Sequence, residues 1–192
     1  MAPELVTALE WTAVVLNLGF TVGIAWEKRW GWVPGFFASL IGVGLYAVQH
    51  TWALTLLNAY YAAMAVYGYR SWGRGGAALP VRERGLRFHA IVLIGCTLGT
   101  LGLASVLGGE LNGRFPQLDA YISVFSLAAT WMMARKVLEN WLYWMVGDAV
   151  AVYLNWRIGY DAYALLNIAY IGLSVAGSMR WSRAYRAERA GR

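Results

Sequence analysis

The stretch LLNAYY at residues 56–61 returns as LLNIAY at residues 165–170, so the pattern LLNxxY occurs twice, 109 residues apart. Apolar residues often match by chance, but Asn, Trp and Gly rarely match together. The same shift aligns further pairs: Trp32 with Trp141, Thr21 with Thr130, Leu45 with Leu154, Val66 with Val175, Gly68 with Gly177 and Trp72 with Trp181. The sequence therefore predicts an internal repeat.

The composition indicates that both copies lie in a membrane protein. Of the 192 residues, 59% are hydrophobic and 14% are charged, and the mean hydropathy is +0.47. A soluble domain is about one quarter charged, so this chain needs lipid around it. Its 11 Trp and 12 Tyr side chains suit the headgroup level of a membrane and also suit stacking on flat ligands inside a bundle.

Seven segments are long and apolar enough to cross about 30 Å of hydrocarbon as helices, which takes about 20 residues each. Their approximate bounds are residues 5–26, 31–48, 52–69, 88–107, 118–134, 138–156 and 160–180. The repeat makes the first three equivalent to the last three and leaves the fourth over. Three crossings end on the opposite side of the membrane, so a second triplet in the same orientation needs one more crossing, which the fourth span provides.

We therefore expect an all-α membrane protein of seven transmembrane helices, built as two parallel three-helix repeats joined by a linking helix, the 3+1+3 arrangement of SWEET proteins. In transporters of this architecture the substrate lies near the midplane, where the repeats meet. The expected parts are a first repeat at residues 5–69, a cytoplasmic linker and linking helix at 70–107, a second repeat at 118–180 and a basic cytoplasmic tail at 181–192.

Positive charge gathers on one face of this arrangement. Of the 16 Lys and Arg side chains, only Arg114 and Arg157 fall outside the loops after the first, third and fifth spans and the C-terminal tail. The positive-inside rule then places the C-terminus in the cytoplasm and the N-terminus outside. Glu4 and Glu10, without a basic cluster, indicate that the first span is not a cleavable signal peptide. Anionic lipid explains the net charge of +6, so we expect membrane lipid and no nucleic acid as a partner.

Asp148 lies inside the sixth span, where an ionisable side chain is costly unless it faces a cavity or a partner. Trp141, Trp144, Asp148 and Asn155 follow one another at helical spacing, which puts them along one face. Such a face could stack a flat ring, attract its positive charge and hydrogen-bond its substituents. Alternatively, Asp148 binds a neighbouring helix and the Trp side chains belong to the interfacial belt.

The repeated motif supplies further polar side chains. Asn58 and Asn167 occupy equivalent positions in the third and seventh spans, with Tyr61 and Tyr170 about one turn further along the same faces. Each amide either contacts a ligand or binds a neighbouring helix. Gln49, near the outer end of the second span, is a further candidate for substrate binding.

The sixth span also carries a resemblance to a known family. Glu139, Asn140 and Trp141, followed by Trp144 and Asp148, resemble the EN-W-x-x-W-x-x-x-D signature of the PnuC family of vitamin-precursor transporters. The first half adds a stretch similar to the family's Trp-Pro-x-Gly start and later Leu-Tyr pair, at Trp32, Pro34, Gly35, Leu45 and Tyr46. The resemblance spans nearly the whole chain.

This resemblance implies facilitated diffusion of a flat vitamin or vitamin precursor through the bacterial inner membrane, usually of nicotinamide riboside, with phosphorylation in the cell trapping the product. Similar transporters carry thiamine, riboflavin or deoxynucleosides. The resemblance adds Trp32 and Asn140 to the candidate substrate-binding residues. We expect no cofactor and no metal.

Other classes of membrane protein fit this sequence less well. A retinal protein needs a lysine in its last span, whereas Lys28 and Lys136 fall in loops. Haem ligation by His50 and His89 is excluded if they lie at opposite membrane faces, as we expect. No spacing of nucleophile and base indicates an enzyme. A receptor or structural role stays open, as does assembly into a homo-oligomer.

Overall fold

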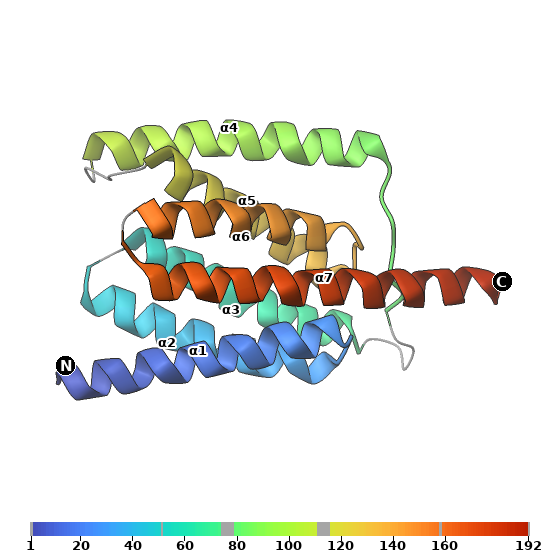
Figure 1. Cartoon of the computed structure of the whole chain (residues 1–192), viewed down its shortest axis with the longest axis horizontal. Helices are drawn as coiled ribbons and strands as arrows, with labels where there is room; N and C mark the ends of the chain where they lie inside the picture. The colour runs from blue at the N-terminus through green and yellow to red at the C-terminus, as the bar shows by residue number, and fades with distance from the viewer. Residues whose placement is uncertain (1, 51, 74–78, 111–115, 158, 192) are drawn as a thin grey trace. The chain divides into compact units, whose positions relative to one another are not determined.

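The computed structural model of the chain describes residues 2–50, 52–73, 79–110, 116–157 and 159–191. Parts of two predicted loops, residues 74–78 and 111–115, lie outside this range. The described residues form seven α-helices and one 3-10 helix (Figure 1), which confirms the predicted number of helices. They are α1 (Pro3–Ala25), η1 (Arg29–Gly31), α2 (Trp32–Val48), α3 (Trp52–Ser71), α4 (Leu86–Glu110), α5 (Pro116–Ala134), α6 (Asn140–Arg157) and α7 (Asp161–Ala190).

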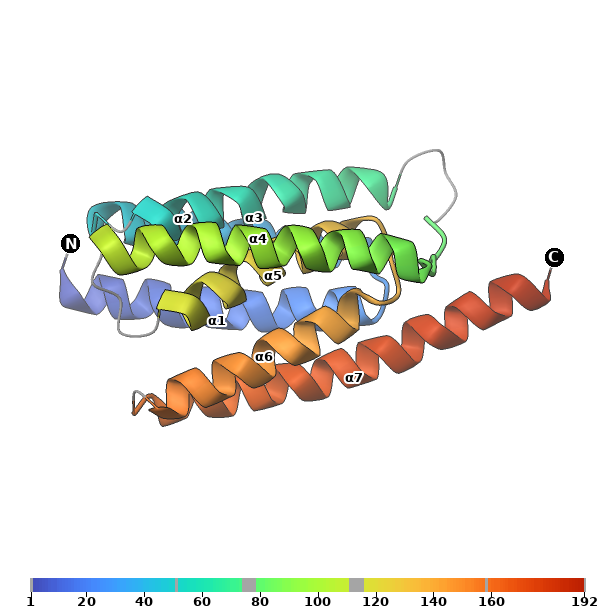
Figure 2. The same cartoon turned by 90° about the horizontal axis from the view of Figure 1, so that it is seen from above.

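The chain folds as two compact units, Met1–Pro80 and Val81–Arg192. In the first unit α2 packs against both α1 and α3. In the second unit α6 packs against both α5 and α7, and α4 packs along α5. Figures 1 and 2 show α6 and α7 side by side. The linking helix α4 thus belongs to the second compact unit, and the expected division of the chain into repeats stays a prediction.

Proline marks the starts of three helices. Pro3, Pro34 and Pro116 lie in the first turns of α1, α2 and α5. The first amides of a helix have no partner inside it, so the missing N–H of proline costs nothing there. This local chemistry explains why the predicted starts of these helices lie within a few residues of the observed ones.

A buried tryptophan anchors α2 on α3 in the first unit. Trp32 begins α2 and is 1% exposed. Its indole lies on the backbone of α3 at Gly68, where a Cβ would overlap the ring. Trp72, about one turn further along, meets Trp32 edge to face with ring centroids 5.5 Å apart. Glycine at position 68 therefore lets the two helices approach closely.

The second unit contains the same contact 109 positions later. Trp141, in the first turn of α6, is 1% exposed, and a Cβ at Gly177 of α7 would lie 2.6 Å from its Cζ2 atom. Trp181 meets Trp141 edge to face, with ring centroids 5.3 Å apart. Each edge-to-face pair contributes about 1 kcal/mol beyond the apolar area that it buries.

The turns after α1 and α5 also share one backbone geometry. Glu27 and Lys136 are left-handed, with φ of 56° and 51°. In each turn the next amide donates to the carbonyl five positions back, with N···O distances of 2.8 Å for Lys28 and 2.9 Å for Val137. This is the Schellman ending of a helix, in which the left-handed position usually holds Gly. A side chain there costs about 1–2 kcal/mol.

Three segments of the described chain qualify as membrane spans by length and apolar composition alone, namely Glu4–Ala25, Arg29–Val48 and Leu86–Val106. The helices α3, α5, α6 and α7 have 20, 19, 18 and 30 residues, which is long enough, but they carry more polar side chains. Polar side chains in membrane helices generally face a bundle interior and not lipid. The less apolar helices are therefore the ones expected to carry the functional groups.

The last helix continues beyond the predicted span. α7 has 30 residues, and Figures 1 and 2 show it running past α6 toward the C-terminus. At 1.5 Å per residue it is about 45 Å long, which exceeds the hydrocarbon thickness of about 30 Å. The segment expected as a basic tail is thus a helical continuation of the last span, with Arg183, Arg186 and Arg189 on it.

Candidate functional site

Asp148 lies in the third turn of α6 and is 9% exposed. A carboxylate in such a position needs a partner or a polar ligand to compensate for lost hydration. Tyr170 on α7 lies within electrostatic range of it. The packing of α6 on α7 therefore brings together two of the side chains predicted for the site.

Trp144 lies one turn before Asp148 on the same face of α6. It packs, partly buried, against an apolar cluster from α4, α5 and the start of α6, formed by Cys96, Phe125, Ala129, Met132, Val137 and Tyr143. Its indole N–H is buried and has no hydrogen-bond partner among the described residues. A buried donor without a partner is uncommon, and a polar group of a ligand could accept this hydrogen bond.

Trp141 has a different environment, although it lies only three residues before Trp144. Three residues along a helix correspond to about 300° of rotation, so the two side chains point about 60° apart. Trp144 faces α4 and α5, whereas Trp141 is enclosed against α7 by Gly177 and Trp181. Trp32 is enclosed in the same way in the first unit. The stripe predicted along α6 is therefore divided between two contacts, and ligand binding by Trp141 and Trp32 stays a prediction.

Asn58 and Asn167 make the same local hydrogen bond in their two units. The side-chain amide of Asn58 donates to the carbonyl of Leu54 at 2.9 Å, and that of Asn167 donates to the carbonyl of Tyr163 at 2.7 Å. In the first unit the Oδ1 atom of Asn58 lies against Gly42 of α2, where a Cβ would overlap it. This contact favours a packing role for Asn58, and ligand contact by Asn167 stays a prediction.

The other predicted residues have varied surroundings. Asn140, the first residue of α6, is fully buried and donates to the carbonyl of Val137 at 2.7 Å, and its Oδ1 has no hydrogen-bond partner among the described residues. Gln49 is exposed at the end of α2. Tyr61 is half-buried beside Tyr60, with ring centroids 6.0 Å apart. Asn140 thus holds the start of α6, and ligand contact by these three residues stays a prediction.

A polar network at the start of α4 was not predicted. His89 Nδ1 lies 3.1 Å from the Tyr143 hydroxyl, and His89 Nε2 lies 3.7 Å from Glu139 Oε1. The sequence holds part of the signal, because Glu139 and Tyr143 are four residues apart and share one helical face. The approach of His89 depends on how α4 packs, which no local pattern specifies.

Together, Asp148, Tyr170 and Trp144 offer a carboxyl group, a hydroxyl and an aromatic surface within the second unit. Such a set suits a flat, positively charged ring with hydroxyl substituents. Within the described part of the chain, no group of three or more His, Cys, Asp or Glu side chains could hold a metal ion.

The sequence and the fold both match known transporters. The family model described as nicotinamide mononucleotide transporter matches residues 7–183. The riboflavin/roseoflavin transporter RibM of Streptomyces davaonensis is 28% identical, over 88% of this chain and 79% of its own length. The nicotinamide riboside transporter PnuC of Escherichia coli is 26% identical, over 93% of this chain and 87% of its own length.

A solved structure has the same fold. The crystal structure of the vitamin B3 transporter PnuC aligns with a TM-score of 0.74, covering 94% of this chain and 83% of that chain at 19% sequence identity. The likeness confirms the expected all-α, seven-helix membrane fold.

Proposed function

The chain belongs to the nicotinamide mononucleotide transporter family, and from this premise we propose that it carries nicotinamide riboside. Membership confirms the resemblance to PnuC transporters and makes the chain a membrane transporter of a small molecule, not an enzyme, receptor or structural protein. The choice of substrate rests on one observation, the buried carboxylate of Asp148 within electrostatic range of Tyr170 and one turn from Trp144.

The charge of the substrate is the physical basis of this choice. Nicotinamide riboside carries a positive charge delocalised over a planar pyridinium ring. A cation over a Trp face gains about 0.5–2 kcal/mol, the larger value applying when the site is dry. A permanent cation also offsets the cost of a carboxylate at the position of Asp148. The ribose hydroxyls offer acceptors for the indole N–H of Trp144.

Riboflavin is the second candidate, because RibM is a riboflavin transporter of similar sequence. Its ring system is flat but uncharged, so it would stack on Trp144 without gaining from the charge of Asp148. Thiamine is a cation and deoxynucleosides are neutral. The charge of the substrate therefore divides the four candidates into two cations, nicotinamide riboside and thiamine, and two neutral compounds, riboflavin and a deoxynucleoside.

We also propose that α1–α3 and α5–α7 form an internal repeat. The left-handed turns at Glu27 and Lys136 support it, as do the two enclosures of a Trp by a Gly 36 positions later in the sequence. Chance does not readily produce the same hydrogen bonds and the same ring contacts at one constant shift.

The proposed location is the bacterial inner membrane, with the N-terminus outside and the C-terminus in the cytoplasm. The concentration of Lys and Arg in alternate loops and in the tail supports this orientation. Facilitated diffusion, with phosphorylation in the cell trapping the product, is the proposed mode of uptake.

Calorimetry on the purified protein with nicotinamide riboside, thiamine, riboflavin and a deoxynucleoside tests the substrate. Trp144→Ala and Asp148→Asn should each weaken binding of nicotinamide riboside by about tenfold or more. Trp156→Ala, on the exposed side of α6, and Asp161→Asn, exposed at the start of α7, are matched controls that should leave affinity unchanged. Binding that survives both site substitutions, or binding of none of the four compounds, would overturn the proposed site and substrate.

A further inference from the structure

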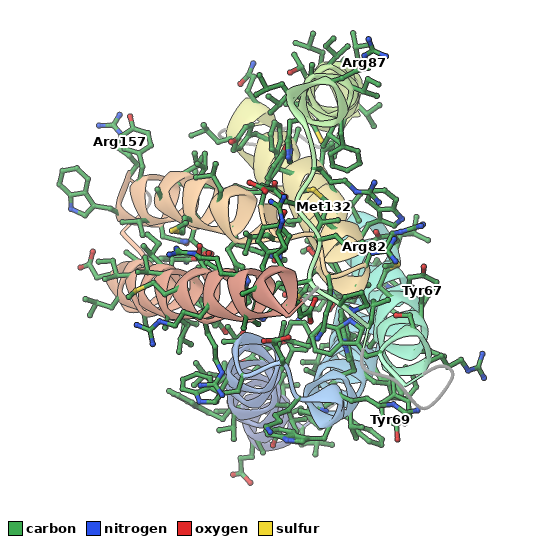
Figure 3. The ribbon with its side chains drawn as sticks, turned by 90° about the vertical axis from the view of Figure 1, so that its right-hand side faces the viewer. Tyr67, Tyr69, Arg82, Arg87, Met132 and Arg157 are labelled. Carbon is green, nitrogen blue, oxygen red and sulfur yellow. The ribbon has the colours of Figure 1, made fainter. Side chains whose placement is uncertain are left out.

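The segment before α4 is fixed to the turn between α5 and α6. The Arg82 N–H donates to the carbonyl of Lys136, and the Leu138 N–H donates to the carbonyl of Arg82, both at 2.8 Å. Val81 beside this bridge is 3% exposed. Figure 3 shows the segment that carries Arg82 crossing the end of the second unit from α4. The linker at residues 81–84, which we call the strap, therefore holds the turn that leads into α6.

Glu139 joins the strap to α4 at the same place. Its Oε1 atom accepts a hydrogen bond from the Arg84 N–H at 2.9 Å and lies 3.7 Å from His89 Nε2. The His89 and Glu139 side chains are only 17% and 22% exposed. The second nitrogen of the ring, Nδ1, lies 3.1 Å from the Tyr143 hydroxyl. One imidazole thus lies between a carboxylate and a hydroxyl that are one turn apart at the start of α6.

The charge of His89 sets the strength of its contact with Glu139. His89 Nε2 and Glu139 Oε2 are buried and have no hydrogen-bond partner among the residues that the structure describes. A neutral imidazole can donate to the Tyr143 hydroxyl or accept from it, so its Nε2 presents either a lone pair or an uncharged N–H to the carboxylate. A protonated imidazole always directs a charged N–H at the carboxylate, and a small shift from 3.7 Å closes a charge-assisted hydrogen bond, which is stronger than a neutral one.

We propose that His89 and Glu139 form a charge-dependent clamp that holds the start of α6 on α4 and thereby positions Trp144 for the substrate. Tyr143, which contacts the clamp, belongs to the apolar cluster against which Trp144 packs. Phe88, next to His89, packs against the same cluster. Closing or opening the clamp therefore shifts the surroundings of Trp144. His89 and Glu139 are positioning residues, and this inference rests on the proposed function.

Three other charges near the clamp lie close to aromatic rings. The guanidinium of Arg84 lies over the Phe88 ring at 5.6 Å, that of Arg135 lies over the Trp131 ring at 5.3 Å, and the Lys136 ammonium lies 6.0 Å from the Trp181 ring. The Glu139 carboxylate is the charge that His89 Nε2 faces directly. The titratable or charged groups on the surrounding elements include Arg82, Glu83 and Arg84 on the strap, Arg87 and Cys96 on α4, Tyr121 on α5, Arg135 and Lys136 in the turn, and Tyr143, Asp148, Tyr153 and Arg157 on α6.

The pH dependence of stability and of affinity tests the clamp. Measurements at about pH 6 and about pH 8 bracket the range in which histidine side chains can change their charge, and the clamp is stronger when His89 is protonated. The melting temperature of the purified protein without ligand should be higher at the lower pH. Its affinity for nicotinamide riboside should be about threefold or more higher there as well. His89→Gln and Glu139→Gln should each flatten both profiles.

The chain offers a matched control for the histidine. His50 is its one other histidine and lies exposed at the end of α2 with φ of 57°, a conformation that Asn tolerates. His50→Asn should keep both wild-type profiles. If His89→Gln does not fold, Glu139→Gln gives the same test, since its amide oxygen still accepts from the Arg84 N–H.

The two readouts separate the clamp from the proposed substrate. A wild-type melting temperature that is the same at both pH values, or one that still varies with pH in both Gln variants, contradicts the clamp. Stability profiles that flatten while the affinity profile is unchanged contradict its action on Trp144. Failure of nicotinamide riboside to bind would count against the proposed function alone, because the stability measurement needs no ligand.

Discussion

Glu27 and Lys136 lie 109 positions apart and adopt the same left-handed backbone conformation, each ending the first helix of a group of three. Five residues after each of them comes a buried tryptophan, Trp32 or Trp141, that lies on a glycine of the third helix. Each group of three helices therefore contains the same left-handed turn followed by the same buried tryptophan. The turn and the tryptophan together fix how the second helix of the group starts, and in the second unit this helix is α6, which carries Asp148.

The left-handed turns can be tested by comparing glycine with a β-branched residue. Glu27→Gly and Lys136→Gly should be more stable than Glu27→Val and Lys136→Val by about 1–2 kcal/mol, because a side chain is strained in this conformation. Both members of each pair lose the original side chain, so the difference isolates the backbone. Thermal unfolding in detergent gives the measurement, and equal stability of the Gly and Val variants would contradict the assigned geometry.

Gly177 should tolerate no methyl group. Gly177→Ala places a Cβ against Trp141 and should destabilise the protein by about 1–3 kcal/mol, the usual cost of overpacking. Gly172→Ala on the same helix meets no atom within 4 Å and is the matched control. It should raise the melting temperature slightly, since Ala favours the helix. A Gly177→Ala variant as stable as Gly172→Ala would show that Trp141 is not enclosed as described.

Tyr170 and Asp148 should be coupled in ligand binding. In a double-mutant cycle with nicotinamide riboside, the effects of Asp148→Asn and Tyr170→Phe should differ from additivity by about 0.5 kcal/mol or more. Tyr163→Phe, exposed on α7, should combine additively with Asp148→Asn. Additive effects in both cycles would mean that Tyr170 and Asp148 act independently.

The orientation of the chain can be read from cysteine labelling, because Cys96 is the single native cysteine and is buried. In a Cys96→Ala background, Ala2→Cys should react with a membrane-impermeant maleimide in intact spheroplasts. Glu188→Cys, on the end of α7, should react only in inverted vesicles. The reverse pattern would contradict the positive-inside assignment.

The sequence predicted the helices well because their limits have local causes. The charges at Lys28 and Arg29 end the first apolar segment, and Pro34 and Pro116 mark starts that the structure places within a few residues of the prediction. The 109-residue shift likewise aligns Trp32 with Trp141 and Gly68 with Gly177, although the shift alone does not say that each ring touches its glycine.

The candidate site was less predictable because tertiary packing divides it. Helical spacing put Trp141 and Trp144 on one face, but a difference of about 60° around the helix is enough to direct them to different neighbours. The pairing of His89 with Glu139 joins positions 50 residues apart and has no periodic signal. The extension of α7 to Ala190 was also missed, because a polar, basic helix has no apolar pattern to mark it.

We propose that Asp148 selects a substrate with a positively charged ring. The most direct test compares the affinity of the purified protein for nicotinamide riboside with that for its reduced, uncharged dihydro form, in the wild type and in Asp148→Asn. We expect the wild type to prefer the cation by about tenfold or more and Asp148→Asn to lose this preference. Equal affinity of the wild type for the two forms, or a preference that persists in Asp148→Asn, would contradict this proposal.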